Sequence, residues 1–195
     1  MLLAAITGSI GCGKTTLAKI ANGLGYAVFD VDGWVRRLYF NREFLKKLEK
    51  HFPGSVKENV ADKRYLRNMV FADREKLKLL ESLIHPFLRA TLKKVIRYNA
   101  RCNDVFFIDV ALLFEMGWDK YCDIVIVADV DYETQKRRVM TRDKVSAEDF
   151  ERINNVQMNN EHKKLLADVV INTDKPKNLL KAELIKIIEG LENGL

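Results

Sequence analysis

The stretch that decides the fold is Leu3-Ala-Ala-Ile-Thr7, followed directly by Gly8-Ser-Ile-Gly-Cys-Gly13-Lys14-Thr15. The first five residues are nearly all apolar, which indicates a buried strand, and the next eight fit the pattern GxxxxGK[ST]. In such a loop the glycines let backbone N–H groups curl around phosphate oxygens, the lysine reaches the β- and γ-phosphates, and the Thr hydroxyl can ligate Mg²⁺. This phosphate-binding loop, or P-loop, predicts that the chain binds a nucleoside triphosphate.

A helical pattern over Thr15–Leu24 follows the loop, and the positive N-terminus of that helix would face the same phosphates. The residues expected to contact the nucleotide here are Gly8, Ser9, Ile10, Gly11, Cys12, Gly13, Lys14, Thr15 and Thr16.

Further apolar runs, separated by helical patterns, predict a doubly wound α/β sheet with right-handed crossovers. Asp131 and Ser146 are expected to cap two of the helices, and the pattern over Pro176–Glu192 predicts a final amphipathic helix. With Leu3–Thr7, the expected strands are Ala27–Phe29, Val105–Ile108, Ile124–Ala128 and Val169–Ile171.

The stretch between the second and third strands, from about residue 32 to 104, is almost wholly helical and too long for one crossover helix. It predicts an inserted subdomain in which Pro86 kinks or breaks a helix. Within it, Asp62 to Arg101 holds eleven Lys and Arg against four Asp and Glu, a local charge of +7 where the whole chain carries +6. This excess of positive charge favours a polyanionic partner, although a solvated helical face is the simpler interpretation.

The composition of the 195 residues excludes disordered, collagenous and repeat proteins, because 48% are apolar and only 3 are proline. The cysteines Cys12, Cys102 and Cys122 form no CxxC pair, so neither a disulfide scaffold nor a zinc ribbon is expected. The sequence instead favours a reducing, cytoplasmic location. No apolar stretch is long enough to cross a bilayer, and no membrane partner is predicted.

Several carboxylates follow predicted strands, at the edge where an α/β sheet binds its ligands. Asp109 follows four apolar residues, as in a Walker B strand, and is suited to hold Mg²⁺. Asp30 and Asp32 follow the second strand and face the phosphates in this interpretation; simple helix capping is the alternative. Asp129 is interpreted as a turn residue.

Gln135, Arg138 and Arg142 share one face of a predicted helix, at i, i+3 and i+7. Beside a P-loop, arginines on a helical lid can neutralise charge on a transferred phosphoryl group. The alternative is an exposed face with ion pairs to Glu133 or Asp143. Arg152 and Gln157, placed in the next helix, are weaker candidates of the same kind.

Four motifs together resemble the dephospho-CoA kinase family over nearly the whole chain. Phe29-Asp-Val-Asp32 with Arg36 is similar to its DxDxxxR segment, and His85-Pro86 to its HP element. Ala111-Leu-Leu-Phe-Glu115 resembles PLLFE, and Gln135 to Asp143 resembles QxxRxxxRD.

The resemblance implies transfer of a phosphoryl group from MgATP to the ribose 3′-hydroxyl of dephospho-CoA, the last step of coenzyme A synthesis. The implied fold is a P-loop kinase core with a five-stranded parallel sheet (residues 1–31 and 104–195), a helical CoA-binding insertion (32–103) and a helical lid (135–160).

The resemblance also implies roles for single residues. Asp32 would accept or orient the proton of the acceptor hydroxyl, and Lys14, Arg138 and Arg142 would act on the ATP phosphates. Asn172 would line the adenine site, unless it is only a turn residue, and His85 would face the substrate, unless it only satisfies a kinked backbone. Further implied substrate residues are Arg36, Leu113 and Glu115, and the Mg²⁺ ligands are Thr15 and Asp109.

Three positions depart from the family pattern. Ala111 replaces a proline, Ser9 a glycine and Cys12 a serine. A thiol at a helix N-terminus beside Lys14 is expected to have a lowered pKa, so Cys12 is predicted to react readily with alkylating agents unless MgATP covers it.

Two other functions stay open at this point. Another small P-loop kinase would act on a nucleoside or nucleotide, and a nucleic-acid-binding ATPase would use the basic Asp62–Arg101 segment. No interleaved aromatic platform supports the second, so no nucleic-acid partner is expected. The sequence does not decide between a monomer and a weak homo-oligomer.

Overall fold

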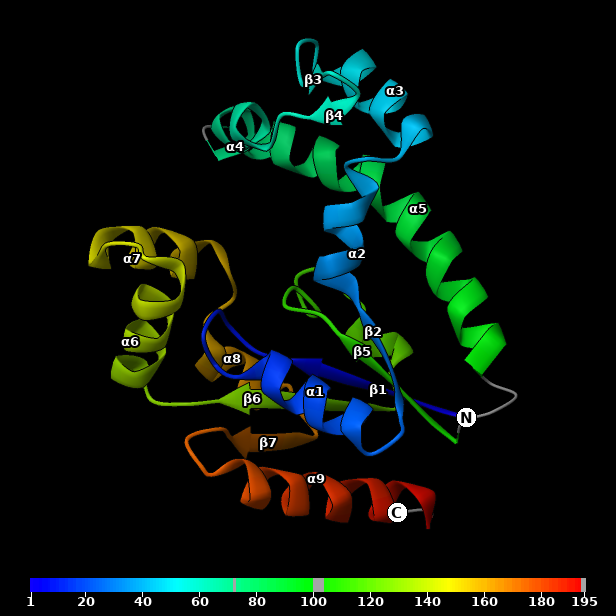
Figure 1. Cartoon of the computed structure of the whole chain (residues 1–195), viewed down its shortest axis with the longest axis vertical. Coiled ribbons are helices and arrows are strands. Elements are labelled where there is room, and N and C mark those ends of the chain that lie inside the picture. Colours follow the sequence, from blue (N-terminus) through cyan, green and yellow to red (C-terminus); the bar gives the residue numbers. More distant parts are fainter. Residues whose placement is uncertain (72, 100–103, 194–195) are drawn as a thin grey trace. The chain divides into compact units, whose positions relative to one another are not determined.

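The computed structural model describes residues 1–71, 73–99 and 104–193. Its larger sheet has five strands, all parallel, in the order β2-β5-β1-β6-β7 (Figure 1). The predicted α/β fold and all five predicted strands are confirmed, each within one residue at either end. The strands are β1 (Leu2–Thr7), β2 (Ala27–Asp30), β5 (Val105–Asp109), β6 (Ile124–Asp129) and β7 (Val169–Asn172).

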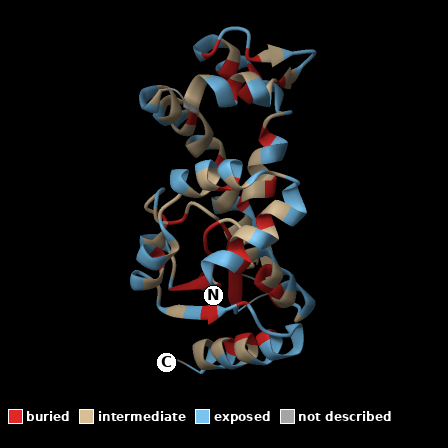
Figure 2. Cartoon of the chain, turned by 90° about the vertical axis from the view of Figure 1, so that its left-hand side faces the viewer, coloured by how far each residue is buried: buried red, intermediate tan, exposed pale blue. Residues whose placement is uncertain are grey.

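The three central strands are apolar nearly throughout because both faces of the sheet are covered. Ile6, Phe107 and Ile126 point into one core with the inner sides of two helices, α1 (Lys14–Gly23) and α9 (Lys177–Glu192). Their neighbours Phe106 and Val125 face the other way and are also buried. Figure 2 shows this concentration of buried residues in the sheet.

The helices after β6 begin where their caps predict. The Asp131 carboxylate accepts from the Thr134 N–H at 2.9 Å, and the Ser146 hydroxyl accepts from the Asp149 N–H at 3.1 Å, so both predicted caps are confirmed. Asn159 caps a short further helix. These elements are α6 (Tyr132–Asp143), α7 (Ala147–Val156) and α8 (Asn160–Leu165), preceded by a 3₁₀ turn, η1 (Asp119–Tyr121).

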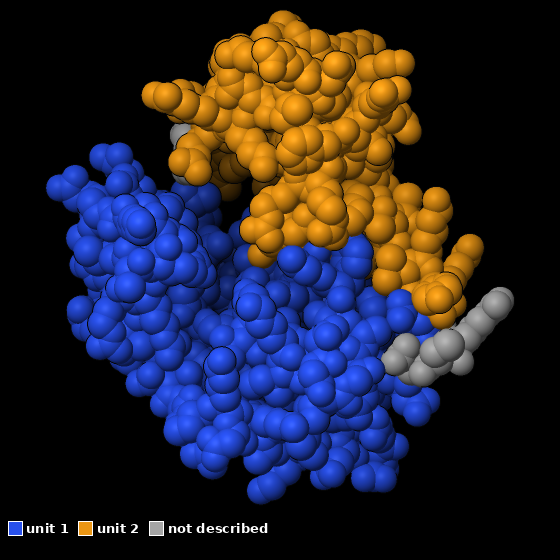
Figure 3. Space-filling view, viewed as in Figure 1, with its two compact units in different colours: residues 1–30, 99–195 blue, residues 31–98 orange. Residues whose placement is uncertain are grey.

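The chain divides into two compact units (Figure 3). The first combines residues 1–30 and 99–195, and the second is formed by residues 31–98. The second unit packs around Phe44, which is fully buried and meets the rings of Tyr39 and Phe87 edge-on. Its elements are α2 (Val31–Leu38), α3 (Arg42–His51), β3 (Val56–Lys57), β4 (Val60–Ala61), α4 (Lys63–Phe71) and α5 (Arg74–Asn99).

The second unit differs from the sequence prediction in one detail. β3 and β4 form a small antiparallel hairpin in a stretch that was predicted to be almost wholly helical. Its turn places Glu58 and Asn59 at φ of 50° and 62°, a left-handed pair without the glycine that usually marks such a turn. Of the two outcomes predicted for Pro86, a kink or a break, the structure shows the kink: α5 runs through Pro86 unbroken and changes direction along its length (Figure 1), as expected where proline removes a backbone donor.

In the described part of the chain, no helix combines the length and the hydrophobicity that a membrane crossing requires. Cys102 and Arg101, which entered the cysteine and charge arguments, lie outside the described residues.

The packing of α9 gives a stability prediction. Leu184 is fully buried beneath the sheet, so Leu184→Ala should lower the free energy of unfolding by about 2–5 kcal/mol, measured by urea denaturation followed by circular dichroism. Leu179 lies on the same helix with 52% of its surface exposed, and Leu179→Ala should cost less than about 0.5 kcal/mol. Equal losses in the two variants would contradict the packing described here.

Candidate active site

The P-loop joins β1 to α1 in a conformation that depends on glycine. Gly11 and Gly13 have φ of 81° and 89°, in the left-handed region. A Cβ on Gly11 would lie 2.9 Å from the carbonyl oxygen of Gln135, and one on Gly13 would lie 2.6 Å from the hydroxyl of Thr173. The loop is therefore restricted to glycine at these positions both by backbone conformation and by close packing against α6 and the segment after β7.

The N-terminus of α1 opens onto this loop. Gly13 is its N-cap and supplies no side-chain acceptor, and the first turn of the helix contains no acidic residue. The partial positive charge of the helix N-terminus is thus not offset by a carboxylate of its own first turn, which favours a bound anion. Thr15 in that turn is exposed, whereas Gly8, Ser9 and Cys12 are buried.

Acidic side chains gather at the carboxyl edge of the sheet, as predicted. The buried Asp109 carboxylate lies 2.8 Å from the Lys14 ammonium, and Asp30 is the register partner of Asp109 on the neighbouring strand. The exposed Thr15 hydroxyl and the Asp109 carboxylate are hard oxygen donors of the kind that Mg²⁺ prefers. Among the described residues no cluster of three or more His, Cys, Asp or Glu could hold a metal ion.

Asp129 has a different role from the turn residue that was predicted. Its carboxylate accepts from the Asn160 amide at 2.7 Å and from the Lys164 ammonium at 3.2 Å, so it anchors the start of α8 to the end of β6. Asn172 is its register partner on β7. The Asn172 amide oxygen accepts from the Asp174 N–H at 2.8 Å, as expected if Asn172 is a turn residue. Its predicted contact with adenine stays a prediction.

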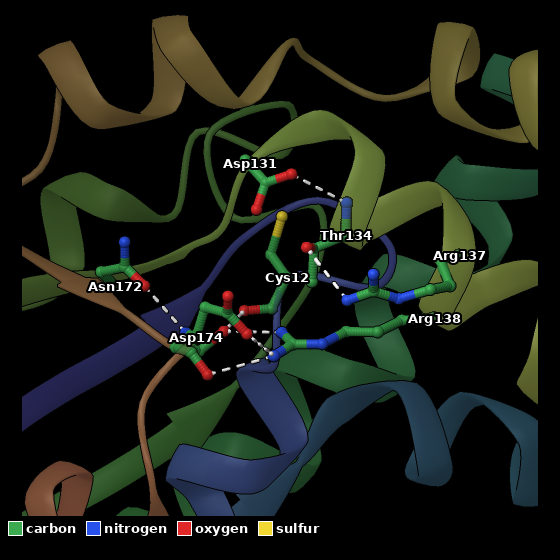
Figure 4. A network of polar contacts seen from close by, with 8 residues as sticks. Cys12, Asp131, Thr134, Arg137, Arg138, Asn172 and Asp174 are labelled. Atoms are coloured by element: carbon green, nitrogen blue, oxygen red, sulfur yellow. Dashed lines mark hydrogen bonds and ion pairs between the residues drawn. The ribbon is translucent and has the colours of Figure 1, made fainter.

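Arg138 extends from α6 to the segment after β7 (Figure 4). Its guanidinium donates to the Thr173 hydroxyl at 3.0 Å, to the Thr173 carbonyl at 3.2 Å and to the Asp174 carboxylate at 3.1 Å. The Thr173 hydroxyl in turn donates to the carbonyl oxygen of Cys12 at 2.8 Å. Arg138 is thereby linked to the P-loop through Thr173, a residue that no sequence motif singled out.

Gln135 and Arg142, the other members of the predicted basic face, have separate partners. Gln135 is buried, and its amide donates to the Ile10 carbonyl in the P-loop at 2.7 Å. Arg142 is exposed and forms two hydrogen bonds with the adjacent Asp143, at 2.8 and 2.7 Å. This is one of the ion pairs named as the alternative to a lid role, so action of Arg142 on ATP stays a prediction.

The expectation for Cys12 is wrong. Its thiol is completely buried, and this burial is the main reason that its pKa is raised, to about 12, with the Asp129 carboxylate acting in the same direction. The positive charges of Lys163 and Arg138 act the other way but do not outweigh burial. The helix N-terminus and Lys14, on which the prediction relied, do not decide the pKa of this thiol.

A buried lysine that the sequence analysis missed binds both ends of the Ala111–Glu115 segment. Lys163 is fully buried; its ammonium donates to the Ala111 carbonyl at 2.7 Å and lies 3.1 Å from the Glu115 carboxylate. Burial lowers the pKa of Lys163, and the nearby Glu115 charge opposes that shift. Leu113 is also fully buried, and its predicted contact with the substrate stays a prediction.

The remaining predicted substrate residues belong to the second unit. Asp32 is in the first turn of α2, two residues beyond the end of β2, and Arg36 follows one helical turn later. His85 is half-buried in α5, and burial is the main reason that its pKa is lowered; Arg89 adds to that shift and Glu81 opposes it. Contact of these three residues with a substrate stays a prediction.

Comparison with known proteins identifies the family. A family model described as dephospho-CoA kinase matches residues 2–178. The chain belongs to the dephospho-CoA kinase family. The dephospho-CoA kinase of Bartonella quintana is 34% identical to it over 192 residues, which are 98% of this chain and 98% of that protein. The resemblance drawn from the sequence motifs is therefore confirmed.

Solved structures agree with membership of the dephospho-CoA kinase family. A Thermus thermophilus protein superposes with a TM-score of 0.87 at 32% identity, covering 97% of each chain. The dephospho-CoA kinase from Campylobacter jejuni superposes with a TM-score of 0.70 at 29% identity, covering 98% of each chain. The expected P-loop kinase fold is confirmed.

The burial of Cys12 gives the first prediction of this site. In the folded protein at pH 8, Cys12 should react with iodoacetamide far more slowly than in the same protein unfolded in urea, because its thiol is inaccessible and almost wholly protonated. Peptide mass spectrometry measures both rates. MgATP should change the folded rate little. A folded rate that matches the unfolded one would contradict the burial described here.

The Lys163–Glu115 ion pair gives a second prediction, which concerns stability. Glu115→Ala should lower the free energy of unfolding by about 3–5 kcal/mol, because it leaves a fully buried ammonium without its counter-charge. Lys163→Met should cost less, since the Glu115 side chain is 23% exposed and can be hydrated once its partner is removed. Urea denaturation of both variants measures the difference. A larger loss in Lys163→Met would show that the buried charge is not the dominant cost.

Proposed function

We propose that this protein transfers the γ-phosphoryl group of ATP to the ribose 3′-hydroxyl of dephospho-CoA, giving coenzyme A and ADP. The observation that carries the proposal is the complete P-loop, with Lys14 paired to Asp109, in a chain that the dephospho-CoA kinase family covers from residue 2 to 178. A different small P-loop kinase is not favoured, because the family match extends through the insertion that a generic P-loop core does not require.

On the ATP side, the backbone of Gly11 to Thr16 and the N-terminus of α1 bind the phosphates. Lys14 exchanges its contact with Asp109 for the β- and γ-phosphates, and Arg138 supplies positive charge from α6. Phosphoryl transfer has a loose transition state, so placement and charge neutralisation supply most of the rate enhancement.

Mg²⁺ would be held by the Thr15 hydroxyl and, directly or through water, by Asp109. Bound there, it would neutralise charge on the β- and γ-phosphates.

On the acceptor side, Asp32 orients the 3′-hydroxyl and takes its proton, and Arg36 on the same helix binds the substrate's phosphates. The basic residues of the second unit suit the diphosphate of dephospho-CoA. His85, whose pKa is lowered by burial, is a neutral hydrogen-bonding partner in this scheme. The reaction is placed in the cytoplasm, which fits the free thiols of Cys12 and Cys122.

The activity is tested with purified protein, MgATP and dephospho-CoA, with the acceptor followed by mass spectrometry. A gain of one phosphoryl group is the expected result. Parallel reactions with nucleosides and nucleotides serve as controls. If a nucleoside is phosphorylated while dephospho-CoA stays unchanged, the acceptor assignment is wrong and the kinase assignment stands.

Two substitutions separate the roles of the nucleotide and acceptor residues. Lys14→Ala should abolish transfer, because the charge that stabilises the transferred phosphoryl group is lost. Asp32→Asn should lower kcat by roughly 10²–10⁴-fold, the usual contribution of general-base catalysis, and leave the Kd for ATP nearly unchanged. Steady-state kinetics and nucleotide titration measure these effects. Loss of ATP binding in Asp32→Asn would contradict its role toward the acceptor.

A further inference from the structure

Three side-chain amides of the first unit hold the first half of the P-loop by its backbone. The Gln157 amide oxygen accepts from the Ile10 N–H at 2.8 Å, and the Asn160 amide oxygen accepts from the Ser9 N–H at 3.0 Å. Gln135 donates to the Ile10 carbonyl at 2.7 Å. We call these three residues, Gln135, Gln157 and Asn160, the amide clamp. They come from three consecutive segments, α6, the end of α7 and α8, and meet on two adjacent loop residues.

The placement of Gln157 differs from the sequence prediction, and the difference explains its contact. It was predicted inside a helix, but α7 ends at Val156 and Gln157 is extended, with φ of −89° and ψ of 155°. Its carboxyl-side neighbour Met158 is also fixed, because the Met158 N–H donates to the Glu115 carboxylate at 2.8 Å. The chain therefore leaves α7 in a conformation that brings the Gln157 amide to the P-loop.

Each of the other two clamp residues is itself held by a second partner. The Asn160 amide donates to the Asp129 carboxylate at 2.7 Å, which fixes which end of the amide faces Ser9. The Gln135 amide also donates to the Asn154 side chain on α7 at 3.1 Å and is only 5% exposed. The Asn160 amide uses both its oxygen and its nitrogen, and the Gln135 amide donates twice from its nitrogen, so each has a defined orientation.

The clamp acts on the two residues that come before the glycine-rich half of the loop. Glycine-rich segments lose much conformational freedom when they are ordered, which weakens ligand binding if that cost falls at the binding step. Fixing Ser9 and Ile10 in advance reduces the number of conformations open to Gly11 and Gly13. The clamp uses backbone groups of Ser9 and Ile10, and the helix N-terminus at Lys14 and Thr15 lies outside it.

We infer that Gln135, Gln157 and Asn160 are positioning residues that pre-organise the P-loop for the phosphates of ATP. The inference rests on the proposed kinase function only for the identity of the nucleotide. It gives Gln135 and Gln157 a role other than the lid role expected from their spacing with the arginines, and it adds Asn160. Ser9, where the family pattern has glycine, adds a fourth contact, since its hydroxyl donates to the Met158 carbonyl at 3.3 Å.

The test compares Gln157→Ala and Asn160→Ala with Asn155→Ala. Asn155 is an exposed amide on α7, two residues before Gln157, so its removal is a matched control that leaves the clamp intact. Each clamp variant should raise the Kd for MgADP and the KM for ATP roughly three- to tenfold, as expected for the loss of one hydrogen bond, and leave the KM for dephospho-CoA unchanged. Asn155→Ala should match the unaltered protein.

Two further measurements separate positioning from simple structural support. Hydrogen exchange followed by NMR should show faster exchange of the Ser9 and Ile10 amides in Asn160→Ala and Gln157→Ala respectively. Thermal unfolding without nucleotide shows whether the variants stay folded at the assay temperature. Folded variants whose amides exchange faster while the Kd for MgADP stays unchanged would overturn the inference, and so would unchanged exchange. Because MgADP binding needs no acceptor, these outcomes are independent of whether dephospho-CoA is the substrate.

Discussion

The first unit depends on one constraint, the close packing of a left-handed glycine loop against two other parts of the same unit. Gly11 packs against Gln135 on α6, and Gly13 packs against Thr173 after β7. At both positions a Cβ would lie too close to the neighbouring residue to be accommodated. The loop therefore does more than leave room for phosphate. α6 and the segment after β7 pack directly against its glycine backbone. The atoms that would bind phosphate are therefore close to those that position α6.

Hydrogen bonds and one ion pair extend this constraint through the unit. Arg138 reaches Cys12 through Thr173, while Gln157 and Asn160 reach Ile10 and Ser9 directly. Behind them the fully buried Lys163 fixes the segment after β5, and the Glu115 carboxylate it pairs with also accepts from the Met158 N–H. Such side-chain networks specify one arrangement because each member left without its partner would be a buried, unpaired polar group.

The electrostatics of the site follow from burial more than from sequence neighbours. Cys12 lies near a helix N-terminus and Lys14, yet its pKa rises because its thiol has no access to water. Lys163 shows the complementary effect, since burial lowers the pKa of its ammonium although a carboxylate lies 3.1 Å away. Both shifts favour the uncharged form, as expected where solvent is excluded.

The sequence by itself determined the five strands of the large sheet, their parallel arrangement, the P-loop, two helix caps and the family. These are local signals: apolar runs set the five strands of the parallel sheet, Asp131 and Ser146 bond to backbone within three residues, and the P-loop motif is contiguous. Only the tertiary structure decided that Gln157 and Asn160 meet the loop, that Lys163 is buried and that Cys12 is inaccessible. Those contacts join residues about 50 to 150 positions apart, and no local periodicity reports which side chains two distant segments will bury together.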